Sequence, residues 1–181
     1  MKLSTPLPVS NKLLAALSRA DYQRVAGDLQ LVSLEFGEVL YEQGDAIRFV
    51  YFPIDSLVSL LTVVDRHLAL EVGMVGREGM VGVAFALGIG TSPFRAMVQG
   101  AGTALRMKAA PFRRELGANP QLRRKLDLYV HALMAQIAQT AACNRFHVVE
   151  ARLARWLLMT RDRVRSNEFR LTQDFLGHML G

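Results

Sequence analysis

The spacing of apolar positions changes along the chain, and each spacing predicts a different kind of element. Residues 11–30 carry leucine, tyrosine and valine at helical spacing, which is typical of amphipathic helices. From about Leu31 to Met107, short apolar runs rich in Val, Leu, Phe and Tyr are separated by glycine or proline. Many short strands with frequent turns favour an antiparallel sandwich or barrel, and residues 49–52 and 57–64 are the clearest strand candidates.

Helical spacing returns after Met107. Pro111 begins a predicted short helix that ends at Leu116, and Pro120 stands at the start of a long helix that runs to about Cys143. Five residues within it recur at spacings of 4, 3, 4 and 3, namely Leu126, Val130, Leu133, Ile137 and Thr140. This spacing is typical of a coiled-coil seam and predicts a dimer helix. The alternative is a helix packed against its own domain.

The last part of the chain predicts the first half of a helix-turn-helix. A helix is expected from Val148 to Arg163, followed by a turn and a short strand at residues 169–171. Thr172 is a good N-cap for a further helix, whose apolar stripe is Phe175, Leu176, Met179 and Leu180, and Gly181 stands where such turns carry glycine. The recognition helix is not in this sequence. We therefore expect these 181 residues to dimerise without binding an operator specifically.

Composition is that of a folded chain, with 51% hydrophobic and 21% charged residues. No apolar run approaches membrane-spanning length, and the N-terminus has no signal-peptide pattern, so no membrane partner and a cytoplasmic location are expected. Cys143 is the only cysteine, which argues against a disulfide, an iron–sulfur cluster or a cysteine zinc site. We expect it to be a small packing residue rather than a redox centre.

The formal charge of +6 is uneven, because most arginines lie in the C-terminal half. A basic segment of this kind suits a partner that carries phosphate, although a solvated helix surface would give the same composition. The residues predicted to contact DNA phosphates are Arg145, Arg152, Arg155, Arg163, Thr172 and Gln173.

Three stretches carry a family resemblance: residues 75–82 (VGREGMVG), residues 37–45 (GEVLYEQGD), and residues 144–181 with their two helices. Together they resemble the Crp/Fnr family of bacterial transcription regulators. The resemblance implies an α+β chain: an antiparallel β-roll (a double-stranded β-helix, cyclic nucleotide-binding-like), a long dimerisation helix and a partial winged helix-turn-helix. The implied domains are 1–118 for the sensor, 119–146 for the connecting helix and 147–181 for the incomplete DNA-binding domain.

The resemblance also implies an effector pocket around the glycine turn, defined as residues 76–82. Its predicted residues are Gly76, Arg77, Glu78, Gly79, Gly82 and Arg95. Glu78 matches the glutamate that holds the ribose in cyclic-nucleotide-binding members. The phosphate-binding arginine has no match, because Phe94 stands at its position and Arg95 follows one residue late, on the opposite face of a strand. Residues 137 and 138, near the base-binding pair, are apolar, so cyclic AMP is disfavoured.

The resemblance implies a homodimer that binds double-stranded DNA, responds to a small-molecule effector and can contact RNA polymerase. The competing interpretation is a cyclic-nucleotide-binding sensor module that acts through protein partners. A cupin-type metalloenzyme is a weaker alternative, since His67 stands alone before Glu71. The histidines show no metal-ligand spacing, and serine-nucleophile and phosphate-loop signatures are absent, so neither a metal, a catalytic residue nor an enzyme is expected.

Overall fold

The computed structural model describes residues 10–65 and 68–164. Two short helices come first, α1 (Lys12–Ala15) and α2 (Arg19–Ala26). Asn11 caps α1 by accepting hydrogen bonds from the amides of Leu13 and Leu14, as an N-cap residue should. Its side-chain amide donates to the carbonyls of Pro53 and Gly79, at 3.0 and 2.9 Å. This buried asparagine therefore fixes the N-terminal helices to the glycine turn.

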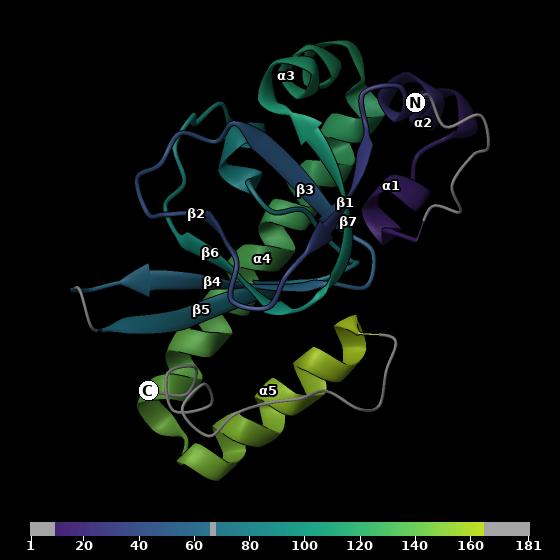
Figure 1. Cartoon of the computed structure of the whole chain (residues 1–181). Helices are drawn as coiled ribbons and strands as arrows, with labels where there is room; N and C mark the ends of the chain where they lie inside the picture. The colour runs from purple at the N-terminus through teal and green to yellow at the C-terminus, as the bar shows by residue number, and fades with distance from the viewer. Residues whose placement is uncertain (1–9, 66–67, 165–181) are drawn as a thin grey trace.

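In the described residues, seven antiparallel strands form two facing sheets (Figure 1). One sheet has the order β1-β7-β3 and the other the order β2-β6-β4-β5. The strands are β1 (Gln30–Leu34), β2 (Val39–Tyr41), β3 (Phe49–Pro53), β4 (Leu57–Val63), β5 (Ala69–Val75), β6 (Arg95–Gly100) and β7 (Gly102–Lys108), with a 3-10 helix η1 (Val83–Leu87) between β5 and β6. The predicted antiparallel β-roll is confirmed, including both of the clearest strand candidates.

The core lies between the two sheets and continues beneath the next helix, α3 (Ala109–Ala118). Val50, Val58 and Val98 are fully buried because alternate residues of each strand point inward. Phe112 of α3 is also fully buried, and its ring lies 6.2 Å from that of Phe52. The structure extends the predicted 111–116 helix by two residues at each end.

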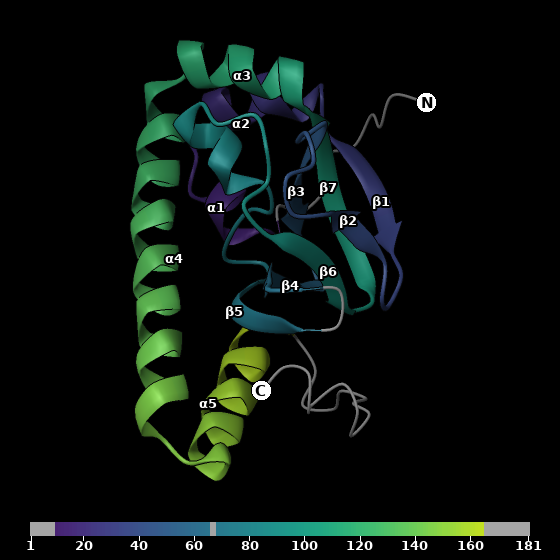
Figure 2. The ribbon, with the colours of Figure 1, turned by 90° about the vertical axis from the view of Figure 1, so that its left-hand side faces the viewer.

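Two helices complete the described chain, α4 (Pro120–Phe146) and α5 (Val149–Arg163). Asn119 caps α4 by accepting from the Leu122 amide, and Pro120 occupies the first turn, where a missing N–H costs nothing. Figure 2 shows α4 running along the whole height of the β-roll, with α5 turning back below β4 and β5. Both predicted helices are confirmed. The predicted strand at 169–171 and the helix from Thr172 lie outside the described residues.

The predicted dimer seam faces the chain's own β-roll. Leu126 and Leu133 are 0% and 5% exposed and belong to the core, and Ile137 packs against it. Val130 and Thr140 are half-buried on the flanks of the same stripe. Heptad spacing reports that a helix has an apolar stripe, but not which surface covers it. Leu126 and Leu133 are therefore covered by the chain's own β-roll in this conformation, as in the packed-helix alternative, while the other three residues keep part of their surface.

Candidate functional site

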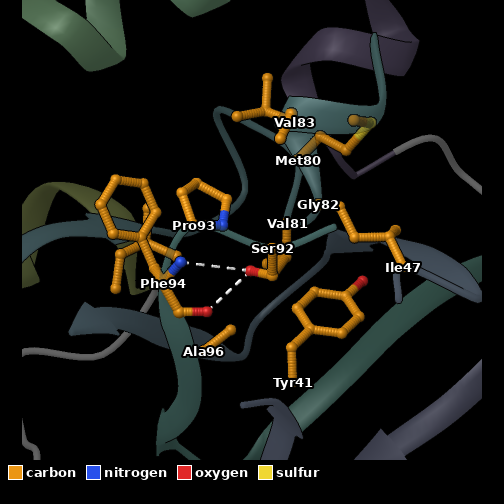
Figure 3. A pocket seen from close by; sticks show the side chains of 12 residues that line it. Tyr41, Ile47, Met80, Val81, Gly82, Val83, Ser92, Pro93, Phe94 and Ala96 are labelled. Carbon is orange, nitrogen blue, oxygen red and sulfur yellow. Dashed lines mark hydrogen bonds between the residues drawn. The ribbon is translucent and has the colours of Figure 1, made fainter. Parts of the chain in front are cut away.

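A small hollow in the β-roll, here called the roll pocket, lies between η1 and β6 (Figure 3). Its lining residues come from β2, β4, the glycine turn, η1, β6 and the segments before β3 and β6: Tyr41, Ile47, Leu60, Met80, Val81, Gly82, Val83, Ala84, Ser92, Pro93, Phe94 and Ala96. The cavity volume is about 20 Å³. A space of that size holds about one water molecule.

Local backbone geometry shapes the roll pocket. Gly82 begins η1 with a φ of 88°, a left-handed conformation that side chains disfavour. A Cβ atom there would also lie 3.0 Å from the Tyr41 hydroxyl. Ser92 holds the opposite wall, because its hydroxyl donates to the Phe94 carbonyl at 2.7 Å and accepts from the Phe94 amide at 3.4 Å (Figure 3).

The chemistry of the roll pocket is apolar. None of its described lining residues is charged, and its side-chain polar groups are the hydroxyls of Ser92 and Tyr41. The Tyr41 hydroxyl donates to the Phe49 carbonyl, and burial raises the pKa of Tyr41 well above its usual range. A phosphate placed here would lack the guanidinium that phosphate sites supply.

The structure does not bring the six predicted pocket residues together. Only Gly82 lines the roll pocket. Arg95 points elsewhere on β6 and forms a surface ion pair with Glu42, with 2.7 Å between Nε and Oε2. The carbonyl of Arg77 accepts a hydrogen bond from the Lys12 amide. Met80, which the sequence analysis did not assign, is fully buried in the lining.

Glu78 contacts α5 rather than the roll pocket. Its Oε1 accepts from Arg163 Nε at 2.8 Å and from the Gly76 amide at 3.2 Å. Arg163 also donates to the Met159 carbonyl at 2.9 Å, so its guanidinium is committed within the chain. The pair is largely buried, with the Arg163 and Glu78 side chains 15% and 29% exposed.

Gly76 and Gly79 allow helices to approach the turn. A Cβ atom at Gly76 would lie 2.6 Å from the Arg163 Cβ, and one at Gly79 would lie 2.2 Å from the Tyr129 ring. Real Cβ atoms essentially never come so close. These two glycines therefore leave room for α5 and α4 to pack against the turn. The family resemblance had predicted a ligand-binding role for them.

A second buried contact fastens α5 to the sheet. Trp156 Nε1 donates to Glu71 Oε1 on β5 at 3.0 Å, and the Ser59 hydroxyl donates to Oε2 at 2.6 Å. The indole packs against Leu57, Leu61 and Met74. Burial raises the pKa of Glu71 to about 7, although the bonds from Ser59 and Trp156 lower it in part. Sequence reasoning missed this link, because the pattern shows only a carboxylate in a strand.

The predicted phosphate-contacting arginines have different surroundings. Arg163 is paired with Glu78 and is mostly buried. Arg155 donates to the Thr140 hydroxyl at 3.2 Å. Arg145 is exposed and lies 5.5 Å from the centre of the Phe146 ring, and Arg152 is half-buried. Thr172 and Gln173 lie outside the described residues.

Other kinds of site find little support in the described part of the chain. Residues 10–65 and 68–164 contain no cluster of metal-ligating side chains. None of the described helices has the length and apolarity needed to cross a membrane. Cys143 is buried, with the Gln139 amide 3.4 Å from its sulfur, which is the setting of a packing residue.

The fold is similar to those of solved bacterial regulators. The c-di-GMP-responsive global regulator CLP of Xanthomonas campestris is 15% identical, with a TM-score of 0.72 over 90% of this chain and 84% of that one. FixK2 from Bradyrhizobium japonicum is 14% identical, with a TM-score of 0.72 over 84% and 77% of the two chains. A cyclic nucleotide-binding domain from Methylobacillus flagellatus is 10% identical, with a TM-score of 0.58 over 76% and 80%. At these identities the likeness shows the fold.

Neither sequence-based comparison returned a match. No model of a known protein family matches the chain, and no curated protein matches its sequence.

Proposed function

We propose that this chain is a transcription regulator of the Crp/Fnr type. The observation that carries the proposal is the order of parts: a β-roll, a 27-residue helix along it, and α5 turning back from that helix. The structural match to the global regulator CLP covers 90% of this chain and so includes this arrangement. In this proposal residues 1–118 are the sensor, 119–146 the connecting helix and 147–181 part of the DNA-binding domain.

The effector of the β-roll is not a cyclic nucleotide in this proposal. The roll pocket has room for about one water molecule and has no charged group in its described lining. Met80 and Phe94 occupy the space with apolar side chains. A cyclic nucleotide would need both a larger cavity and a cation for its phosphate.

The dimer of this proposal uses the outward face of α4, away from the β-roll. Met134 is 63% exposed, and the nearby Ala135, Ala138 and Ala142 are exposed as well. Small side chains let two helix backbones approach closely, and the spacing of these alanines is 3 and 4. The outward face therefore replaces the seam predicted from Leu126 to Thr140.

DNA binding in this proposal uses the basic C-terminal part of the chain. Arg145 is exposed and is the candidate for a phosphate contact among the described residues, while Arg155 and Arg163 are engaged within the chain. Phosphate contacts of this kind set affinity and its salt dependence rather than sequence choice. RNA polymerase is a further proposed partner.

Selection from a random duplex DNA library tests the function, using the natural protein as expressed from its own gene. The proposal predicts enrichment of a two-fold symmetric site whose half-sites lie about one helical turn apart. A dimer that enriches no sequence would contradict it and would favour the alternative of a sensor module acting through protein partners. Light scattering on the same sample establishes whether the dimer is present.

A further inference from the structure

A second and larger hollow, here called the α4 cavity, lies beside the glycine turn. Its wall comes from α1, the turn residue Glu78, the middle of α4 and the last turn of α5. It has a volume of about 350 Å³ and shares no described lining residue with the roll pocket. That volume lies at the lower end of the range for small-molecule sites.

The charges around the α4 cavity do not cancel. Lys12, Lys125 and Arg163 bring three positive charges, and Glu78 brings one negative charge. The negative charge is already matched, because Glu78 is paired with Arg163 at 2.8 Å. Among the described residues, neither Lys12 nor Lys125 takes part in an ion pair. Two ammonium groups are therefore available to an anion that enters the cavity.

The remaining lining is mainly apolar. Leu13 and Leu133 are each 5% exposed and lie at the floor, where they continue into the core. Leu128 is 59% exposed and Ala132 is exposed, so this part of the wall is open to solvent. An exposed leucine beside two lysines suits a ligand that has both an apolar body and an acid group.

We infer that the α4 cavity binds a small organic anion, whose acid group meets Lys12 and Lys125 and whose apolar body covers Leu13, Leu128 and Leu133. The inference deepens the proposed function, because it assigns the effector class to a site outside the roll pocket. Lysine ammonium groups attract carboxylate and phosphate alike.

The α4 cavity is coupled to α5 through Arg163. Arg163 contributes to the cavity wall and lies in the last turn of α5. Trp156 lies seven residues earlier, on the same side of that helix, and is the only tryptophan of the sequence. An anion held by Lys12 and Lys125 adds negative charge beside the Glu78–Arg163 pair that fastens the end of α5. Occupancy therefore changes how α5 packs on the sheet, and the fluorescence of the buried Trp156 reports that change.

Calorimetry on the 181-residue chain tests the inference with three probes of one chain length: hexanoate, hexyl phosphate and 1-hexanol. Both anions should bind and change Trp156 fluorescence, and 1-hexanol should bind at least about tenfold more weakly, because it lacks the charge. The stronger of the two anions identifies the acid group. Equal binding of hexanol and the anions would overturn the inference.

Variants locate the binding. The double variant Lys12→Gln, Lys125→Gln should lose about tenfold or more in hexanoate affinity, whereas Lys108→Gln, an exposed lysine outside the cavity, should lose none. Ala132→Phe should block the cavity and abolish binding without touching a lysine. Unchanged affinity in either cavity variant would refute the site.

Salt provides a measurement that depends on no variant. Raising NaCl from about 20 mM to about 500 mM should weaken hexanoate binding to the wild-type chain, since the Debye length shortens several-fold. Salt-independent binding would contradict an acid group on two lysines. None of these measurements uses DNA. A chain that selects a DNA site but binds no hexanoate would refute this inference and leave the proposed function standing.

Discussion

The roll pocket and the α4 cavity both border the glycine turn, yet their chemistry is opposite. Met80, Val81 and Gly82 face a hollow of about 20 Å³ with no charged group in its described lining. Glu78 faces a hollow of about 350 Å³ whose lining also includes three positively charged side chains. Glu78 and Met80 are only two positions apart in the sequence, yet they face two different hollows.

This difference shows that a sequence motif does not by itself locate a site. The glycine turn keeps the pattern of glycines and a glutamate, but its close contacts are with Tyr129 of α4 and Arg163 of α5. The turn therefore connects the β-roll to α4 and α5. Four predictions test this contrast between the apolar roll pocket and the charged surroundings of the α4 cavity.

The largest effect is expected for Leu133→Asp. The side chain is 5% exposed in the core, so an aspartate there would bury a carboxylate without a described partner. We expect a loss of about 4 kcal/mol or more in the free energy of unfolding, measured by urea denaturation. The matched control is Ala138→Asp on the outward face, which should keep the monomer folded and weaken the dimer in light scattering. A folded, monomeric Leu133→Asp would restore the original seam assignment.

The second effect concerns pH and Glu71. Burial raises its pKa in the folded chain to about 7 from an ordinary value of 4.5, so folding favours the protonated form. The contribution of Glu71 to the free energy of unfolding is fully present below about pH 4.5. It is lost as the pH rises through 7, and the total loss is about 3 kcal/mol. Glu71→Gln, which resembles the protonated acid, should remove this part of the dependence. Urea melts of both proteins from pH 5 to 8 measure it, and parallel curves would disprove the assignment.

The third effect compares two arginines that the sequence analysis assigned to ligands. Arg163→Ala breaks a pair in which both side chains are less than a third exposed, and about 2 kcal/mol of stability should be lost. Arg95→Ala breaks a pair with side chains 36% and 48% exposed, and less than about 1 kcal/mol should be lost. Urea denaturation at one pH ranks the two variants. The reverse order would mean that α5 does not depend on the glycine turn.

The smallest effect is expected for cyclic nucleotides. The roll pocket has neither the volume nor the charge for a cyclic phosphate, so titration with cyclic AMP or cyclic GMP should release no heat at micromolar concentrations. Calorimetry on the wild-type chain measures this directly. Micromolar affinity for either nucleotide would show that Phe94 and Met80 move aside, and the roll pocket would then be the sensor.

Local rules predicted the architecture well. Strand spacing around Phe49 and Leu57 located β3 and β4, and Pro120 marked the start of α4, because backbone geometry and side-chain alternation act within a few residues. The partners of those elements were less predictable. The stripe of Leu126 and Leu133 could face either a second copy or the β-roll, and only the tertiary packing decides between them.

The candidate site depended even more on tertiary contacts. Glu78 pairs with a residue 85 positions away, and Glu71 binds Trp156 at the same separation. No spacing rule connects residues so distant. The sequence signal that did bear on the site was the mismatch at Phe94, which pointed away from a phosphate site.

The methyl NMR spectrum of leucine and methionine residues during a hexanoate titration tests the central claim most directly, namely that ligands bind outside the roll pocket. The account predicts shifts for the Leu13, Leu128 and Leu133 methyls of the α4 cavity, with the Met80 methyl of the roll pocket unchanged. Shifts at Met80 without shifts at those three leucines would contradict it.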